Sequence, residues 1–201
     1  MRILSLIAVV FFVSSLATPA RAGMAEDCQQ FQDSDLKIDG CTAMIQTGLL
    51  QGKTLATVYS NRAYAYVKLG KHHLGIADLY EALRLNPGDA VNYNNRGLAY
   101  YKLDEYRRAI EDYDQALQID PGLANVYVNR GNSYRSLGEY ERAIRDWEQA
   151  IRIDGASRTK PWQEYLKGKG HYSGAIDGIY GPGTRRALMA CARDPRCGVV
   201  E

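Results

Sequence analysis

Histidine is scarce in this chain of 201 residues, which has three, and no common catalytic motif accompanies them. The sequence lacks a Gly-x-Ser-x-Gly nucleophile motif, a His-Glu-x-x-His metal motif and a phosphate-binding glycine loop. We expect the adjacent His72 and His73 to face solvent at a turn, and His171 has no acid-base partner at a useful spacing. These absences argue against an enzyme and predict neither a cofactor nor a metal site.

A hydrophobic run long enough to span a bilayer is also missing at the N-terminus. The apolar stretch at residues 3–16 follows Arg2 and precedes an Ala-Arg-Ala site at residues 20–22. This pattern is typical of a secretory signal peptide, whereas a membrane helix needs about 20 apolar residues. We predict that residues 1–22 are a signal peptide, so that the mature chain begins at Gly23 and is soluble, periplasmic or secreted. An uncleaved anchor is the alternative.

The mature chain has no excess of charge of either sign. The sequence has 25 basic and 23 acidic residues, and removal of Arg2 and Arg21 leaves 23 of each. A balanced chain has no general electrostatic attraction for polyanions. We therefore expect it to bind neither nucleic acid nor a membrane surface.

Cysteines are few, but their number is even. Cys28 and Cys41 lie near one end of the mature chain, and Cys191 and Cys197 lie near the other. Four cysteines allow three connectivities, of which the local one, Cys28 with Cys41 and Cys191 with Cys197, is favoured for an exported protein. A zinc site is the alternative, but the spacing lacks a Cys-x-x-Cys pattern.

Between the cysteine pairs the sequence contains a repeat. Three blocks of 34 residues, beginning at Ala56, Ala90 and Ala124, align without a gap, and nine positions are identical in all three. Apolar and small residues recur at three- and four-residue intervals over two stretches of each block, with a Gly or Asp break near position 15. Each block therefore predicts a helix, a turn and a second helix.

The blocks resemble tetratricopeptide repeats over residues 56–157. The resemblance rests on a small residue at position 8, tyrosine at 11, alanine at 27 and proline at 32. The matching residues are Ala63, Gly97 and Gly131; Tyr66, Tyr100 and Tyr134; Ala82, Ala116 and Ala150; and Pro87 and Pro121. It implies an all-α solenoid of three helical hairpins, in which the small residue lets the two helices of a repeat approach closely. Gly75 and Gly155 depart from the pattern, which suggests a weaker first repeat and an end of the array near residue 155.

Arginine at position 7 and aspartate at position 23 are identical in all three blocks. The pairs are Arg62 with Asp78, Arg96 with Asp112, and Arg130 with Asp146. The simplest interpretation is an ion pair that joins the two helices of each repeat. A ligand-binding role is the alternative.

The resemblance also implies a concave groove lined by the first helix of each repeat, where a peptide or protein segment binds. Asparagine at position 6 is similar to the residue with which some tetratricopeptide proteins hold a bound peptide, and Lys68 and Lys102 supply part of a carboxylate clamp. The predicted groove residues are Ser60, Asn61, Tyr64, Asn94, Asn95, Leu98, Tyr101, Val128, Asn129, Asn132 and Arg135.

The segments on either side of the repeats have separate interpretations. Residues 23–55 predict one amphipathic helix that caps the array, with Leu36, Ile38, Ala43, Met44 and Ile45 packing against it. Residues 158–201 predict a short helix from Trp162 to Lys167, a glycine-rich loop and a second helix that starts near Pro182.

The residues of this last segment, "GHYSGAIDGIYGPGTRRAL", resemble the peptidoglycan-binding-like domain found beside bacterial wall hydrolases. The resemblance implies a small helical domain that docks on peptidoglycan, and the cysteine bridge and the last repeat are expected to complete its fold. The candidate wall-binding residues are Tyr172, Asp177, Tyr180, Thr184 and Arg185.

The sequence thus predicts an exported, non-enzymatic adaptor that binds a protein segment in its groove and peptidoglycan through its C-terminal domain. A scaffold whose last domain is a cap or a protein-docking module is the second hypothesis. An enzyme acting on wall fragments is the third, and the sequence supplies no acid-base pair for it.

Overall fold

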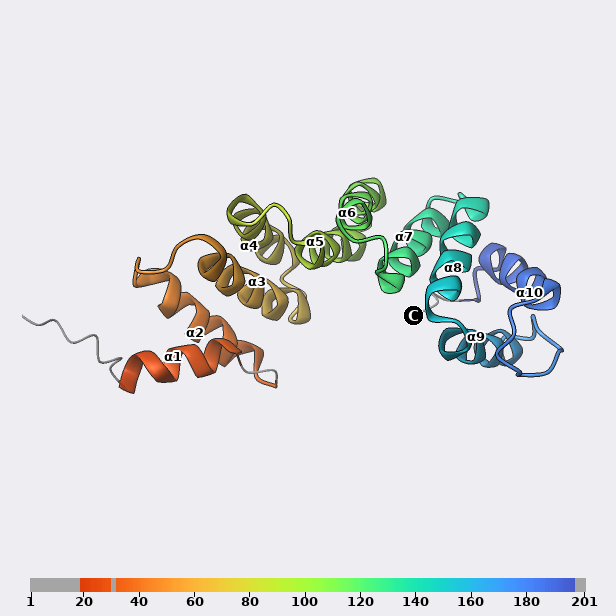
Figure 1. Ribbon diagram of the computed structural model, residues 1–201, viewed down its shortest axis with the longest axis horizontal. Coiled ribbons are helices and arrows are strands. Elements are labelled where there is room, and N and C mark those ends of the chain that lie inside the picture. The colour runs from red at the N-terminus through yellow and green to blue at the C-terminus, as the bar shows by residue number, and fades with distance from the viewer. Residues whose placement is uncertain (1–18, 30–31, 198–201) are drawn as a thin grey trace, which may run out of the picture.

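The computed structural model describes residues 19–29 and 32–197, and this part of the chain is helical, with no strand (Figure 1). The predicted all-α class is therefore confirmed. Its helices are α1 (Pro19–Gln29), α2 (Ser34–Gln46), α3 (Gly52–Lys68), α4 (His72–Leu85), α5 (Ala90–Lys102), α6 (Tyr106–Ile119), α7 (Ala124–Ser136), α8 (Tyr140–Asp154), α9 (Ala156–Gly168) and α10 (Pro182–Arg193). None of these described helices has the length and apolar character needed to span a membrane.

Most of the predicted signal peptide, residues 1–18, lies outside the described residues. The predicted cleavage point before Gly23 falls within α1.

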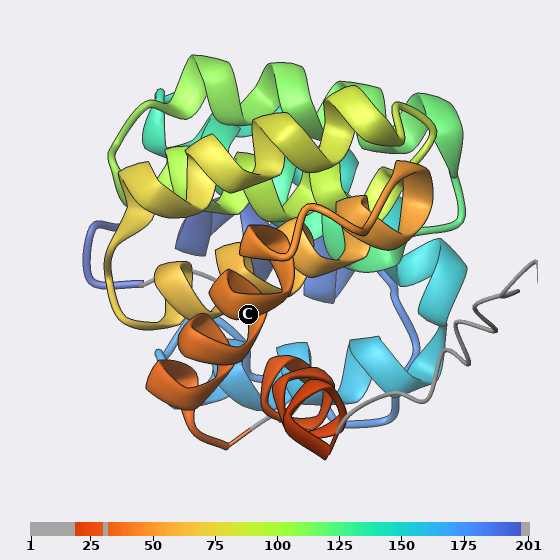
Figure 2. The same ribbon diagram turned by 90° about the vertical axis from the view of Figure 1, so that its left-hand side faces the viewer.

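Helices α3 to α8 form three hairpins that stack in order, so that the array is elongated (Figure 1) and follows a curved path when viewed along its length (Figure 2). The turn inside each hairpin has one residue with a positive φ: Gly70 at 74°, Asp104 at 60° and Gly138 at 76°. These are the Gly or Asp breaks of the sequence, and glycine adopts this conformation without a steric penalty. The predicted helix–turn–helix blocks are confirmed.

The small residue at position 8 gives the two helices of a hairpin their close approach. A Cβ added to Gly97 would lie 2.7 Å from the Tyr113 ring, and one added to Gly131 would lie 2.6 Å from Trp147 Nε1. Tyr113 and Trp147 are fully buried. In the first repeat the smaller Leu79 leaves room for Ala63, so the residue at position 8 matches the size of its neighbour.

The three predicted ion pairs are present in the same geometry. In each repeat the arginine Nε and Nη2 donate to the two carboxylate oxygens of the aspartate 16 residues later, at 2.7 to 2.8 Å. Such bidentate pairs are strong and fix orientation. Asp112 and Asp146 are buried, and this burial raises the pKa of each carboxyl group.

The arginine of each pair also reaches back to the preceding unit. Arg62 Nη1 donates to Thr42 Oγ1 at 2.9 Å, the Arg96 guanidinium lies 4.3 Å from the ring centroid of Tyr80, and Arg130 Nη1 donates to Asp114 Oδ1 at 2.6 Å. One side chain therefore joins two helices of its own repeat and a helix of the unit before it. The contact within each repeat was predicted from the sequence, whereas the contact with the preceding unit was not.

Two helices, rather than the single predicted one, precede the first repeat. Helix α1 packs on α2, α2 packs on α3, and a disulfide joins Cys28 to Cys41. A loop of this length stabilises the folded state by about 3 kcal/mol in the chain-entropy model. The prediction that Leu36 packs inward was wrong, since this side chain is 45% exposed. Helices α1 and α2 cross closely at Gly40 and Cys41 instead.

The C-terminal unit comprises α9, a loop, α10 and the disulfide between Cys191 and Cys197. Gly155 has a φ of 60° and lets α9 start directly after α8. The helix predicted to start at Trp162 therefore begins earlier, at Ala156. The predicted end of the repeats, residue 157, falls inside this helix. Helix α10 begins at Pro182, as predicted, and packs on α8 and α9. The expected contact between this unit and the last repeat is thus confirmed.

Candidate groove along the first helices of the repeats

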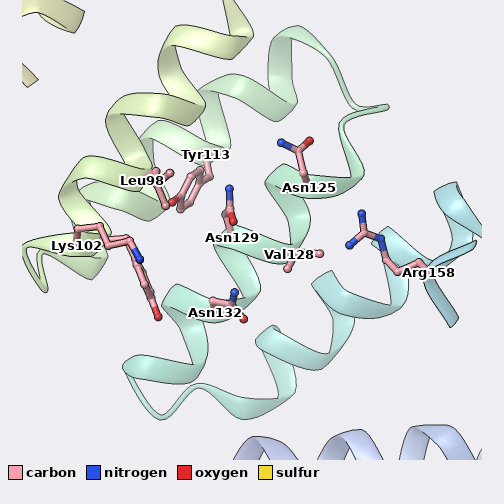
Figure 3. Close-up of a pocket in the computed structure, with 9 residues that line it drawn as sticks. Leu98, Lys102, Tyr113, Asn125, Val128, Asn129, Asn132 and Arg158 are labelled. Atoms are coloured by element: carbon pink, nitrogen blue, oxygen red, sulfur yellow. The ribbon is translucent and has the colours of Figure 1, made fainter. Parts of the chain in front are cut away.

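Three pockets follow one another along the face formed by the first helices α3, α5 and α7. The N-terminal pocket has a volume of about 280 Å³, the middle pocket about 290 Å³ and the C-terminal pocket about 400 Å³. The N-terminal pocket is lined by Ala25, Cys28, Gln29, Met44, Lys53, Thr54, Thr57, Val58 and Asn61. The middle pocket is lined by Tyr64, Val67, Lys68, Leu79, Asn95, Leu98 and Lys102. The C-terminal pocket is lined by Leu98, Tyr101, Lys102, Tyr113, Asn125, Val128, Asn129, Asn132 and Arg158 (Figure 3).

The pockets form one continuous groove. Leu98 and Lys102 on α5 belong to both the middle and the C-terminal pocket, while Asn61 and Tyr64, three residues apart on α3, lie in the N-terminal and the middle pocket. Residues three apart on a helix share a face. None of the three pockets is closed, so together they form an open, elongated surface.

Each pocket contains one of the three identical asparagines, which stand at the same position of successive repeats. Asn61 lies in the N-terminal pocket, Asn95 in the middle pocket and Asn129 in the C-terminal pocket. Asn129 Nδ2 donates to Asn94 Oδ1 at 3.0 Å, while the Asn95 side chain has no hydrogen bond within the described residues. Side-chain amides offer both a donor and an acceptor, which is the chemistry needed to hold an extended backbone.

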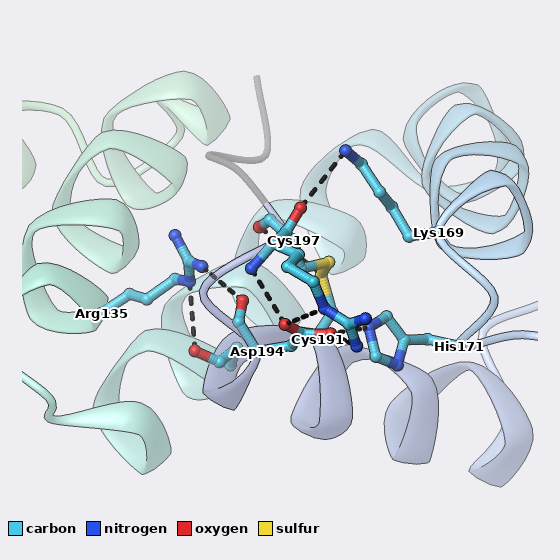
Figure 4. Close-up of a disulfide and its surroundings, with 8 residues drawn as sticks. Arg135, Lys169, His171, Cys191, Asp194 and Cys197 are labelled. Atoms are coloured by element: carbon cyan, nitrogen blue, oxygen red, sulfur yellow. Dashed lines mark hydrogen bonds and ion pairs between the residues drawn. A yellow bond between two sulfur atoms is a disulfide. The ribbon is translucent and has the colours of Figure 1, made fainter.

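Of the eleven predicted groove residues, eight line a pocket and three do not. Those that line a pocket are Asn61, Tyr64, Asn95, Leu98, Tyr101, Val128, Asn129 and Asn132. Ser60 donates to Asn92 Oδ1 at 2.5 Å, and Asn94 accepts from Asn129, so both side chains lie between neighbouring repeats. Arg135 donates to the carbonyl oxygens of Ala192 and Asp194, both at 3.1 Å, and is therefore committed to the C-terminal unit (Figure 4).

The flanking helices also contribute to the groove, which was not predicted from the sequence. Helices α1 and α2 supply four residues of the N-terminal pocket, and α9 supplies Arg158 at the far end of the C-terminal pocket. Arg158 is paired with Asp154 at 2.6 Å. No signal in the sequence indicates these contacts, because they depend on where the flanking helices pack.

The five candidate wall-binding residues have partners inside the molecule. Gln163, which sequence analysis also missed, is fully buried and lies at the centre of the C-terminal unit. Its Nε2 lies 2.8 Å from Asp177 Oδ1, 3.2 Å from the Tyr172 hydroxyl and 3.3 Å from Thr184 Oγ1. The hydrogen bond from Gln163, with a second from the Ile179 backbone N–H, lowers the pKa of Asp177. This network fixes the glycine-rich loop on α9.

The other two candidates, Tyr180 and Arg185, join the C-terminal unit to the last repeat. The Tyr180 hydroxyl donates to Glu148 Oε1 at 2.8 Å, and Arg185 Nε donates to the same oxygen at 2.7 Å. Glu148 stands at the position of its repeat that Tyr80 and Asp114 occupy in theirs. Tyr80 and Asp114 each contact the arginine of the following repeat. The C-terminal unit therefore contacts α8 at the same position at which one repeat contacts the next.

Comparison with protein-family models identifies the repeats. Models described as "Tetratricopeptide repeat" match residues 56–89, 90–123 and 124–155. Residues 56–155 are three tetratricopeptide repeats. A search of curated proteins found no match.

Solved structures with similar folds include other tetratricopeptide proteins. A crystal structure of MamA is 21% identical, with a TM-score of 0.60, and the match covers 80% of this chain and 84% of that one. YrrB, described as a TPR protein with an unusual peptide-binding site, is 21% identical, with a TM-score of 0.54 and 60% of each chain covered. The first TPR of Spaghetti (RPAP3), solved with the HSP90 peptide SRMEEVD, is 24% identical, with a TM-score of 0.50, and covers 53% of this chain and 84% of that one. These similarities show the fold.

The tetratricopeptide array and its flanking helices hold no cluster of three or more His, Cys, Asp or Glu side chains in the described residues that could bind a metal. His171 Nε2 lies 3.2 Å from Asp194 Oδ2, beside the Cys191–Cys197 disulfide (Figure 4). This partner was not predicted. His72 is half-buried at the start of α4, whereas His73 is exposed, so the expectation of solvent exposure was wrong for His72.

Proposed function

We propose that this protein is a non-enzymatic adaptor whose tetratricopeptide groove holds a segment of a partner protein. The observation that carries the proposal is the continuous row of three pockets, each with one of the identical asparagines. Similar folds are named as binding peptides, among them the first TPR of Spaghetti (RPAP3) with an HSP90 peptide. Internal contacts give no reason for asparagine at this position of the first two repeats, because the side chains of Asn61 and Asn95 make no hydrogen bond within the described residues, whereas Asn129 donates to Asn94.

The proposal includes export to an oxidising compartment. The N-terminal sequence has the pattern of a signal peptide, and the cysteines pair locally, Cys28 with Cys41 and Cys191 with Cys197. Disulfides persist in the bacterial periplasm and outside the cell.

Site-specific photocrosslinking tests the groove in the cells that make the protein. Tyr64 is 50% exposed and lines the middle pocket, while Tyr80 is 49% exposed and lines none of the three pockets of the groove. A benzoylphenylalanine is placed at one or the other position. We expect a discrete adduct with a second protein from position 64 and none from position 80, as seen by gel shift and mass spectrometry. Equal adducts from both positions, or none from position 64, contradict the proposal.

Docking of the C-terminal unit on peptidoglycan is a second candidate function. It rests on the sequence motif, since the polar groups of the candidate residues already have intramolecular partners. The large apolar side chain that the motif exposes is Ile179 in the loop, which is 68% exposed.

Cosedimentation with insoluble peptidoglycan tests this second function. If it holds, the full chain pellets, an Ile179→Asp variant remains in solution, and a Leu49→Asp variant, altered at a side chain 64% exposed outside the unit, pellets like the parent. If the parent chain stays in solution, the C-terminal unit is a cap on the repeats, and the groove proposal is unaffected.

A further inference from the structure

The groove is lined by basic side chains without any acidic one. Lys53, Lys68, Lys102 and Arg158 line the three pockets, and no aspartate or glutamate does. Arg158 is paired with Asp154, and Lys68 also lines a separate pocket with Asp33 and Asp35, but none of the three lysines has an ion pair within the described residues. The balanced charge of the mature chain is therefore unevenly distributed, with an excess of basic side chains along the three pockets.

A buried lysine of α2 lies next to the middle pocket. Lys37 of α2 is buried, and its Nζ lies 5.4 Å from the ring centroid of Tyr64 in the middle pocket. Burial lowers the pKa of Lys37, and the nearby charge of Lys68 lowers it further.

Lys68 and Lys102 stand at the same position of the first two repeats, as the last residues of α3 and α5. They therefore project from the same rim of the groove, one repeat apart. Lys102 belongs to both the middle and the C-terminal pocket, beside Leu98, so each acidic group bound there has an apolar pocket next to it. The apolar lining comes from Tyr64, Val67 and Leu79 in the middle pocket, and from Tyr101 and Val128 in the C-terminal pocket.

We propose that the groove binds an extended internal segment of a partner that alternates apolar and acidic side chains. The apolar side chains occupy the middle and C-terminal pockets, and the acidic side chains lie against Lys68 and Lys102. The inference rests on the proposed function, and it names the chemistry of the segment that the groove selects. Ion pairs on a rim of this kind add selectivity and salt dependence more than affinity.

The test measures the fluorescence anisotropy of labelled peptides bound to the full chain. Three peptides, acetylated and amidated at their ends, have leucines at the same places and glutamate, glutamine or lysine between them. We expect the glutamate peptide to bind most tightly and to weaken as salt is added, because exposed charges are screened. The Lys68→Gln, Lys102→Gln double variant should bind it roughly tenfold more weakly, since each exposed pair contributes at most about 1 kcal/mol.

The control is a Lys71→Gln, Lys167→Gln double variant, which removes two exposed lysines that line none of the described pockets and should leave the affinity unchanged. Equal or tighter binding of the glutamine or lysine peptide overturns the inference, as does binding of none of the three. Binding that requires a free C-terminal carboxylate on the glutamate peptide also overturns it. In each case the crosslink from position 64 shows separately whether the groove still holds a protein partner.

Discussion

Replacement of Trp147 by alanine is expected to lower the free energy of unfolding by about 4 kcal/mol, the range found for large buried aromatic residues. Trp147 is fully buried on α8, lies against Gly131 of α7, and meets Trp162 of α9 edge to face at 5.9 Å between ring centroids. It belongs to one core cluster with residues of α9 and α10. Its loss therefore affects both the third repeat and the C-terminal unit.

Urea unfolding followed by circular dichroism measures this loss. The chain has two tryptophans, so the fluorescence of the remaining Trp162 reports in the variant on the contact between α9 and the last repeat. A loss below about 1 kcal/mol would show that the core collapses around the missing ring, contrary to the expectation.

Gly131→Ala provides a matched test of the same contact. In the parent chain the new methyl group meets the Trp147 ring, and we expect a loss of about 2 kcal/mol from overpacking. In the Trp147→Ala background the ring is gone, and the same change should be neutral or stabilising by up to about 1 kcal/mol, because alanine favours a helix more than glycine does. The same sign in both backgrounds would exclude the ring as the reason for glycine at this position.

The repeats were predictable from sequence because each one contains the same short-range sequence features. Helix periodicity, a residue able to adopt positive φ at the turn, and a small residue facing an aromatic one all lie within 34 residues and recur three times. The Arg–Asp pairs were predictable for the same reason, since both partners belong to one repeat. Repetition turns one local pattern into an array, because neighbouring repeats bury the faces that a single repeat leaves exposed.

The errors arose where one unit meets a different one. Arg135 has the position of a groove residue, but the C-terminal unit places the carbonyl groups of Ala192 and Asp194 within its reach. Leu36 has the position of a packing residue, but α1, which was not predicted, crosses α2 on another face. Gln163 has no distinguishing pattern in the sequence, because its partners come from a loop whose path depends on the fold. Contacts of this kind depend on tertiary packing, which a local pattern does not encode.

Arg130→Gln is expected to lower the free energy of unfolding by about 3 kcal/mol at neutral pH, because it leaves the buried carboxylate of Asp146 without a cation. The Asp146 side chain is 9% exposed, whereas Asp114, the second partner of Arg130, is 49% exposed. Loss of the exposed partner in Asp114→Asn should therefore change stability by less than about 1 kcal/mol. Thermal and urea unfolding of the two variants, side by side, separate the contributions of the two carboxylates.

The effect of Arg130→Gln has a definite dependence on pH. Burial already raises the pKa of Asp146 in the parent chain, and removal of the guanidinium raises it further. A carboxyl group whose pKa is higher in the folded than in the unfolded state favours folding when protonated, and this advantage is lost as the pH rises through the folded pKa. The free energy of unfolding that the variant loses should thus be largest at neutral pH and should shrink as the pH falls toward the ordinary carboxyl pKa of about 4.

An Arg130→Gln, Asp146→Asn double variant should regain most of the lost stability and show little pH dependence over this range. A deficit that is constant with pH would mean that Arg130 acts through the packing of its side chain rather than through its charge.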